Sequence, residues 1–271
     1  MAILVVGGAG YIGSHAVREL REKGRDVVVF DNLEQGNSQS IGDTTFFKGD
    51  LRKAADLRKV FHSHAIDAVM HCASRSLIGE SMQMPERYYE TNVSGTLNLL
   101  TAMHAAGVKN LVFCSSGAIY GEPERIPIEE DHPQSPISVY GHTKLCVEKM
   151  LEWFDTIYGL KSVVLRCFNA AGADPSGRIG ELHAQETHLI PLAIDAAMGG
   201  RDYVPLFGAD YPTRDGSCVR DYVHVCDIAD AHMRALDWLA AGKPSAVFNI
   251  GRGSGGLFIG DIRLYSVIRF D

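Results

Sequence analysis

Short apolar runs rich in β-branched residues alternate with longer segments of helical periodicity along the first 170 residues. The apolar runs are "AILVV", "DVVVF", "TTFFKGD", "DAVMH", "NLVFCSS" and "SVVLRCFN". Near-continuous apolar runs are typical of parallel strands, because helices cover both faces of their sheet. Between them the pattern predicts helices over Ile12 to Lys23, Lys53 to Ser63, Glu86 to Ala106 and Val139 to Tyr158. The fold class is therefore α/β, with a doubly wound, mostly parallel sheet.

The residue pattern changes at Gly172, from alternating apolar and helical segments to polar stretches. The polar stretches "GADPSGRIGE" and "GADYPTRDGS" are punctuated by Gly and Pro, and one helix is predicted between them over Leu189 to Met198. We therefore expect two parts. Residues 1–171 form the sheet domain, and residues 172–271 form a small, incomplete lobe for the substrate with interspersed returns to the sheet.

Composition narrows the class of protein. The 271 residues are 46% hydrophobic and carry a formal net charge of -7, which does not favour a nucleic-acid partner. No apolar run approaches the ~18 residues that span a membrane, so we expect no membrane partner and a cytoplasmic location. The six cysteines form no C-x-x-C pair and are expected to be reduced core residues. The eleven histidines show no familiar ligand spacing, and no metal site is predicted.

The stretch "VVGGAGYIGS" places Gly7, Gly10 and Gly13 between the first strand and the first helix. A helix N-terminus that follows a strand directly offers unpaired N–H groups and the positive end of the helix dipole to an anion. Gly7 allows the tight turn, Gly10 the close approach of a pyrophosphate, and Gly13 the packing of helix on strand. A purely structural turn is the alternative.

Asp31 ends the second predicted strand, 18 positions after Gly13. A carboxylate there can accept hydrogen bonds from a ribose diol and repels a 2'-phosphate, which favours NAD over NADP. Asp50, at the end of "KGD", is similarly placed for the adenine edge. Capping is the alternative role for both side chains, of a helix for Asp31 and of a loop for Asp50.

The stretch "YGHTK" places Tyr140 and Lys144 four residues apart on one helix face. A nearby positive charge favours phenolate, and bringing a phenol from a pKa of about 10 to neutrality takes roughly 4 kcal/mol. The lysine and an oxidised nicotinamide together could supply it, which makes Tyr140 a general base toward a hydroxyl. Ser116, at the end of a strand, is placed to bond the same substrate oxygen. A surface Tyr/Lys pair and a turn cap are the alternatives.

Further stretches extend the pattern: "VVVFDNL", "MHCAS", "IGES", "TNVSGTLNLL", "SSGAIYGEP", "RCFNAAGADPSGRIGE", "HLIP", "FGADYPTRDG" and "VRDYVHVCDIADAH". In these, and in their order and spacing from Met1 to about Gly255, the chain resembles the extended short-chain dehydrogenase/reductases and, within them, the UDP-glucose 4-epimerases. The resemblance implies an NAD-binding Rossmann fold. It also implies interconversion of UDP-galactose and UDP-glucose by transient oxidation at the sugar C4.

The resemblance also implies site residues. Ser116, Tyr140 and Lys144 are the implied catalytic residues, and they also adjoin the NAD. The remaining NAD site is implied at the glycine turn and at Tyr11, Ile12, Asp31, Asn32, Asp50, Leu51, Cys72, Ala73, Ser74, Arg75, Ser76, Thr91, Asn92 and Phe168. The UDP-sugar is implied to contact Ser116, Asn169, His188, Leu189, Pro205, Leu206, Phe207 and Arg220. The fork of Arg220 suits pyrophosphate, and its alternative is an ion pair with Asp221 or Asp215.

The chain departs from the family pattern at Ser76, at Cys167 and above all after "FNIGRGSG", where "GLFIGDIRLYSVIRFD" alternates like a strand. We expect the chain to lack the usual C-terminal segment of the family, to which this tail looks unrelated. Three alternatives stay open: another nucleotide-sugar epimerase, a 4,6-dehydratase, and an NAD-binding chain without turnover. A dehydratase needs an Asp/Glu pair beside the serine, and the chain has Gly117 and Ala118 there.

The resemblance also implies a homodimer. Its interface would use the helices over Glu86 to Ala106 and Val139 to Tyr158, whose apolar side chains include Leu97, Leu100, Leu145 and Met150. The alternative for these four side chains is packing on the sheet.

Overall fold

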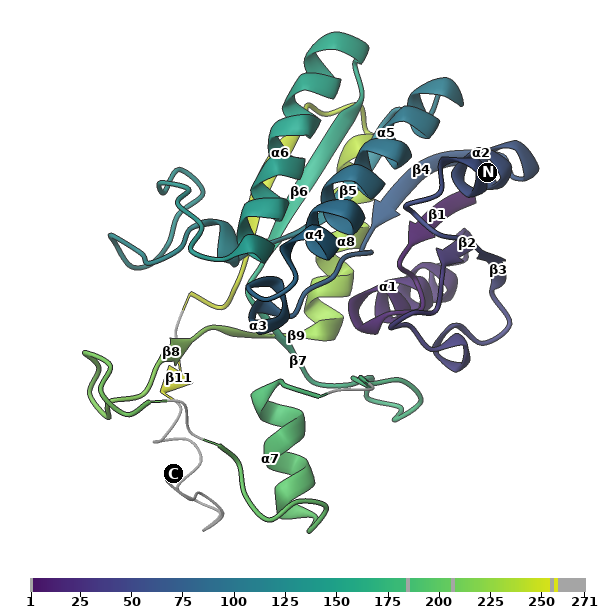
Figure 1. Cartoon of the computed structure of the whole chain (residues 1–271). Helices are drawn as coiled ribbons and strands as arrows, with labels where there is room; N and C mark the ends of the chain where they lie inside the picture. The colour runs from purple at the N-terminus through teal and green to yellow at the C-terminus, as the bar shows by residue number, and fades with distance from the viewer. Residues whose placement is uncertain (1, 184–185, 206–207, 254–255, 258–271) are drawn as a thin grey trace.

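A single parallel sheet organises the chain in the computed structural model, which describes residues 2–183, 186–205, 208–253 and 256–257 (Figure 1). Its seven strands lie in the order β10-β6-β5-β4-β1-β2-β3, and every neighbouring pair is parallel. The predicted fold class is confirmed. The strands are β1 (Ala2–Val6), β2 (Asp26–Asp31), β3 (Thr45–Lys48), β4 (Ile66–His71), β5 (Asn110–Ser116), β6 (Lys161–Cys167) and β10 (Ala246–Ile250).

Helices cover both faces of this sheet. α1 (Tyr11–Glu22) and α8 (Val225–Ala240) pack on one face, and α2 (Ala54–Ser63), α5 (Gly95–Ala105) and α6 (Val139–Tyr158) pack on the other. Successive side chains of a strand point to opposite faces, so Val5 enters the first core while Leu4 and Val6 enter the second. The all-apolar strand sequences follow from this double burial.

The single helix predicted over Glu86 to Ala106 is wrong in detail. The segment consists of α4 (Pro85–Tyr88), the π-helix η2 (Tyr89–Ser94) and α5, and it follows the short α3 (Ile78–Ser81). A π-helical turn contains an extra residue, and such turns occur often at functional sites. Here the turn carries Asn92, whose buried amide binds the backbone of Arg75. That tertiary contact leaves no trace in the hydrophobic periodicity.

The chain after Gly172 forms the smaller elements. α7 (Leu189–Ala197) agrees with the predicted helix and lies well below the sheet in Figure 1. Two separate two-stranded sheets also lie outside the main sheet: β7 (Asn169–Ala171) pairs with β9 (Tyr222–His224), and β8 (Val219–Arg220) pairs with β11 (Gly256–Leu257). The tail that was expected to alternate like a strand lies, beyond β11, outside the described residues.

Two elements of the sheet domain come from the C-terminal third of the chain. α8 packs against α1, and β10 extends the sheet beside β6. The expected returns to the sheet are thus present, although the sequence analysis assigned them no bounds. The helical spacing of α8 is carried by four buried residues: Val225, Ile228, His232 and Leu236. Two short 3-10 turns, η1 (Ser38–Ile41) and η3 (Gly117–Ile119), complete the described elements. None of the described helices is both long enough and apolar enough to cross a membrane.

Candidate active site

A cleft of about 1560 Å³ opens where the carboxyl ends of β1, β4, β5 and β6 face the region of α7. A smaller cavity of about 120 Å³ adjoins it at the ends of β1, β2 and β4, and Gly7 and Gly10 line both. Ligands of open parallel sheets bind at this carboxyl edge. The cleft is lined by Tyr11, Ile12, Gly13, Cys72, Ser74, Ser76, Ser116, Tyr140, Lys144, Phe168, Asn169, His188, Leu189, Pro205 and Arg220. The smaller cavity is lined by Asp31, Asn32, Asp50, Leu51, Cys72, Ala73, Ser74, Arg75 and Thr91.

The glycine turn has the geometry of an anion cradle. Gly7 has a φ of 79°, which favours glycine, and Gly10 is the N-cap of α1 with no side-chain cap. A Cβ on Gly13 would lie 2.1 Å from the Gly7 carbonyl oxygen, so the helix approaches the strand too closely for any side chain. A Cβ on Gly10 would meet only that oxygen, at 3.4 Å. Gly10 therefore leaves free space at the helix terminus, where a pyrophosphate fits.

Asp31 ties the end of β2 to this turn. One carboxylate oxygen accepts a hydrogen bond from the Ala9 N–H at 3.0 Å, and the other accepts from the Leu33 N–H at 2.8 Å. Burial raises the pKa of Asp31, while these N–H groups act in the opposite direction. Each oxygen keeps a further lone pair, so the carboxylate can hold the turn and still accept from a diol.

Charged side chains surround the smaller cavity. The Arg52 guanidinium binds both oxygens of Asp50, with Nε at 2.9 and 3.2 Å, and it lowers the pKa of that carboxyl. The guanidinium of Arg75 is buried and pairs with Glu34, and it lies 3.7 Å from Glu80. Asp50 is thus mainly the partner of Arg52, although it also lines the cavity.

Two neighbouring residues of η2 differ in role. Thr91 lines the smaller cavity, and its buried Oγ1 has no hydrogen-bond partner among the described residues. The Asn92 side chain lines neither cavity, because it is buried between the backbone of Arg75 and the Thr143 hydroxyl, with bonds of 2.8 to 3.0 Å. Asn92 therefore positions the loop after β4, whereas the Thr91 hydroxyl is buried beside the smaller cavity without a partner among the described residues.

The start of α6 carries the Tyr140 and Lys144 pair. The helix begins after Ser138, whose hydroxyl caps the Gly141 N–H, and the Tyr140 N–H donates to the Ser81 hydroxyl at 3.2 Å. The Lys144 Nζ is buried, donates to the Cys114 carbonyl at 2.7 Å and lies 5.8 Å from the centre of the Tyr140 ring. This pair faces the cleft and is not a surface pair.

Ser116 lies beside this phenol at the end of β5. Its Oγ accepts from the Ala118 N–H at 3.1 Å, so the turn-cap role considered from the sequence is real. Its hydroxyl also interacts with the Tyr140 phenol and lowers the pKa of that group. Because a hydroxyl can both accept and donate, the cap does not exclude contact with a substrate oxygen.

The electrostatics of the pair differ from the sequence-based expectation. Burial dominates: it raises the pKa of Tyr140 and lowers the pKa of Lys144. One N–H of the Lys144 ammonium donates to the Cys114 carbonyl. Lys144 alone does not bring the pKa of the phenol toward neutrality. A second positive charge in the cleft is needed to make Tyr140 a base near neutral pH.

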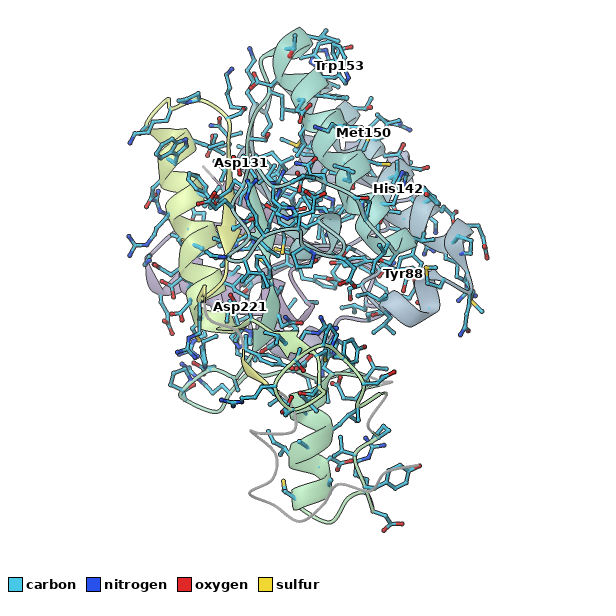
Figure 2. The ribbon with its side chains drawn as sticks, turned by 90° about the vertical axis from the view of Figure 1, so that its left-hand side faces the viewer. Tyr88, Asp131, His142, Met150, Trp153 and Asp221 are labelled. Atoms are coloured by element: carbon cyan, nitrogen blue, oxygen red, sulfur yellow. The ribbon has the colours of Figure 1, made fainter. Side chains whose placement is uncertain are left out.

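The lobe side of the cleft presents polar groups of both signs. The Asn169 amide donates to the Asp221 carbonyl at 3.0 Å, and hydrogen bonds to Glu181 and Glu186 raise the pKa of His188 to about 9. The Asp221 carboxylate, which Figure 2 shows at the junction with the lobe, accepts from the backbone N–H groups of Arg252 and Gly253. Arg220 lines the cleft. The predicted Leu206 and Phe207 lie outside the described residues.

The sequence analysis missed Ser81 as a supporting residue, and it missed the tertiary contacts of Tyr11 and Cys114. Ser81, within the quoted "IGES" stretch, accepts the Tyr140 N–H and so fixes the first turn of α6. Tyr11 donates its hydroxyl to the Gly172 carbonyl at 2.6 Å and ties the glycine turn to the lobe. Cys114, expected to be a core residue only, also lines the cleft floor. No spacing rule finds these contacts, because each joins distant parts of the chain.

The model of the NAD dependent epimerase/dehydratase family matches residues 3–251. The chain belongs to this family. It is 52% identical over 255 residues to a UDP-glucose 4-epimerase of Halalkalibacterium halodurans, covering 94% of this chain and 76% of that relative. Membership in the family thus rests on a match that contains every described residue of the cleft.

Solved structures of this family superpose on the chain. A UDP-glucose 4-epimerase from Brucella ovis in complex with NAD has a TM-score of 0.95 at 42% identity, covering 100% of this chain and 85% of that one. A UDP-glucose 4-epimerase from Bifidobacterium longum, in complex with NAD+ and UDP, has a TM-score of 0.90 at 35% identity, covering 95% and 80%. The epimerase/dehydratase fold therefore extends through the lobe.

Proposed function

We propose that the chain is an NAD-dependent enzyme that interconverts UDP-galactose and UDP-glucose by transient oxidation at the sugar C4. One observation carries the proposal: Tyr140, with Ser116 and Lys144 beside it, lies in one cleft between the glycine turn and the lobe. The relatives named above are UDP-glucose 4-epimerases, and two of their structures hold NAD.

The residues of the NAD site fit a dinucleotide. The uncapped N-terminus of α1 and the free space at Gly10 suit the pyrophosphate, and the lone pairs of Asp31 suit a ribose diol. Thr91 lines the same cavity, and its buried Oγ1 has no partner among the described residues. When bound, the nicotinamide would accept hydride from the sugar and return it. The residues that would hold the cofactor are the lining residues given above, with Asn92 as a positioning residue behind them.

The chain's own residues move and hold a proton. Tyr140 takes the proton of the 4-hydroxyl, and it returns a proton to the same oxygen when the ketone is reduced. Ser116 bonds that oxygen, and Lys144 adds positive charge close to the phenol. Since burial alone keeps Tyr140 protonated, the site forms phenolate only when another positive charge enters the cleft. This couples the base to occupancy of the cofactor site.

The lobe side would hold the UDP-sugar. Arg220 supplies a bidentate cation for the pyrophosphate, and Asn169 supplies an amide beside it. His188, Leu189 and Pro205 line the same wall, and Leu206 and Phe207 belong to the proposed set by resemblance. We assign residues 1–171, together with α8 and β10, to the cofactor domain, and the rest of 172–271 to the substrate lobe.

We also propose a homodimer through the outer faces of α5 and α6. Leu97 is 44% exposed and Leu145 is half-buried, whereas Leu100 is fully buried and packs on the sheet, so its part in the interface is withdrawn. Trp153 and Ile157 add exposed apolar surface, and Figure 2 shows Trp153 near the far end of α6. A mass of two chains by light scattering at micromolar concentration supports the dimer, and a monomer removes it.

The test of the function is product formation. Purified chain with NAD and UDP-galactose is expected to yield UDP-glucose, measured by proton NMR of the anomeric signals. Tyr140→Phe is expected to lower the rate by about 10²–10⁴-fold. Tyr158→Phe on the exposed end of the same helix is the matched control and should leave the rate unchanged.

Three results would contradict the proposal. A 4-keto-6-deoxy product would identify a dehydratase. Retention of NAD with no change of UDP-galactose would identify a cofactor-binding chain without turnover. Equal rates for wild type and Tyr140→Phe would remove Tyr140 from the mechanism.

A further inference from the structure

Four potential metal ligands meet in the segment that leads into α7. They are Glu181, His183, Glu186 and His188, and one donor atom from each lies within 4.8 Å of all the others. The sequence spacing, E-x-H-x-x-E-x-H, matches none of the motifs considered above. The contact is made by the fold of the segment, which brings the two imidazoles to 5.2 Å between ring centres.

The distances suit a small tetrahedral ion. The Nδ1 of His188 lies 2.7 Å from a Glu186 oxygen and 2.9 Å from a Glu181 oxygen, and the Nδ1 of His183 lies 3.2 and 3.5 Å from oxygens of the same two carboxylates. Ligand atoms at about 2.1 Å from a tetrahedral zinc ion lie about 3.4 Å apart. To reach this spacing, the two shorter separations must lengthen by about 0.5 to 0.7 Å, which a change of side-chain rotamer can supply.

The charge of the cluster calls for a cation. Only 8% of the Glu181 side chain is exposed, and a buried carboxylate is normally paired or bound to metal. Among the described residues, the ion pairs of Glu181 and Glu186 are made with these two histidines alone, and no Lys or Arg takes part. Without an ion, the proton that the two carboxylates hold on His188 offsets part of their charge. A bound ion replaces this proton, and two carboxylates and two neutral imidazoles then balance one divalent charge.

We propose that Glu181, His183, Glu186 and His188 bind one divalent ion of the zinc class and so fix the segment before α7. Nitrogen and oxygen ligands in a tetrahedral set are typical of Zn²⁺ and Co²⁺ and unlike the all-oxygen sets of Ca²⁺ and Mg²⁺. Coordination through Nδ1 keeps the proton of His188 on Nε2, which makes that atom a donor. The ion is not a reactant, and the inference does not depend on the proposed function.

The test uses tag-free, fully reduced protein and Co²⁺ alone as the probe. The expected result is one Co²⁺ per chain, with the intense visible bands of a tetrahedral site, displaced by Zn²⁺. His183→Ala and the isosteric Glu186→Gln should each weaken binding at least ~10-fold. His62→Ala, an exposed histidine on α2, is the matched control and should leave binding unchanged.

Several outcomes would overturn the assignment. They are no stoichiometric binding by the wild type, equal affinity in both variants, or the weak bands of an octahedral ion. A thiolate charge-transfer band would place the ion on cysteines and would also refute it. The wild-type spectrum decides the ligand class on its own, so the test stands even if one variant fails to fold. A rise in melting temperature with Zn²⁺ that Glu186→Gln abolishes is the supporting result in solution.

Discussion

The two walls of the cleft are built in different ways. The sheet wall rests on two cores, in which strands and helices bury side chains such as Val5, Leu20 and Leu99 completely. On the lobe wall, α7 buries only Ala196, and its Ile194 is 54% exposed. The lobe is held instead by polar contacts. Examples are the ion pair of His188 with Glu181 and the hydrogen bond from the Arg252 N–H, in the loop after β10, to the Asp221 carboxylate.

This difference in packing indicates that the two walls of the cleft differ in rigidity. Packed apolar cores keep a fixed geometry, because they have few alternative arrangements of similar energy. Regions with few buried apolar contacts open at a lower free energy than the core. The cofactor wall is therefore preformed, whereas the substrate wall depends on hydrogen bonds, charge and bound ligand for its shape.

Matched truncations in the two walls test this contrast most strongly. Leu99→Ala removes a fully buried side chain of α5 and is expected to lower the free energy of unfolding by about 2–5 kcal/mol. Ile194→Ala on α7 should cost less than about 0.5 kcal/mol, because half of that side chain already contacts solvent. Urea denaturation measures both variants. Similar losses in the two would break the comparison.

The glycine turn separates the stability of the sheet wall from its binding role. Gly13→Ala places a Cβ 2.1 Å from a backbone oxygen, so about 1–3 kcal/mol of unfolding free energy should be lost. Gly10→Ala meets nothing closer than 3.4 Å and should fold normally, yet its methyl group occupies the space proposed for the pyrophosphate. Thermal melts should therefore show the larger loss of stability for Gly13→Ala, and NAD titration should show the larger loss of affinity for Gly10→Ala. If one variant showed both the larger loss of stability and the larger loss of NAD affinity, the separation of the two roles would be contradicted.

Acid should weaken the sheet wall through His71. Its Nε2 donates to the Thr96 hydroxyl, which itself donates to the Asn92 carbonyl, and its buried Nδ1 has no partner in the described structure. Burial, with a smaller contribution from Lys144, lowers the pKa of His71 from its ordinary 6.5 to about 3. Between pH 6.5 and 3, His71 therefore binds a proton in the unfolded chain but not in the folded chain.

The sign follows from that difference. The stabilisation is complete above pH 6.5 and is lost as the pH falls from 6.5 toward 3, at up to about 1.4 kcal/mol per pH unit. Urea denaturation at pH 7.5, 6.5 and 5.5 measures the loss, and His71→Asn should reduce its slope. An unchanged slope in the variant would assign the acid sensitivity to other groups.

The smallest expected effect concerns cofactor choice. Asp31→Asn keeps only one of the two acceptors of the turn and removes the charge toward the ribose diol, so NAD affinity should fall about tenfold, or about 1.4 kcal/mol. The same change should narrow the preference for NAD over NADP, because the charge that repels a 2'-phosphate is gone. Fluorescence titration of the reduced cofactors gives both affinities. A wild-type chain that binds the two equally would contradict the role of Asp31.

Much of the sheet domain could be predicted from sequence because its signals are local. β-branched runs identified β1 to β6, and the ends of α6 matched Val139 and Tyr158. The π-helical turn around Asn92 could not be predicted, since it depends on a bond to the distant Arg75 backbone. α8 was not predicted for another reason. Its sequence has helical periodicity, but the Gly- and Pro-rich stretches near it indicated loops.

The candidate site was predictable as a set of residues and less so as a set of roles. The glycine turn, Asp31 and Tyr140 carry motif spacing, and all of them line the cavities. The direction in which the pKa of Tyr140 moves needs three-dimensional information, because burial raises it more than the hydrogen bond to Ser116 lowers it. The meeting of His183 and Glu186 likewise depends on how a loop closes, which no periodic pattern encodes.

The position of α8 has a consequence for how the chain is made. α8 covers the sheet face formed by Met70, Val112 and Val163, but it is encoded far downstream of these strands. A ribosome adding ~5–20 residues per second needs several seconds to pass from β5 to the end of α8. During that interval a broad apolar surface has no cover, and its closure requires contacts between α1 and a helix more than 200 residues away. An apolar face exposed for this time favours association between nascent chains, so slowing translation after β6 should lower the soluble yield.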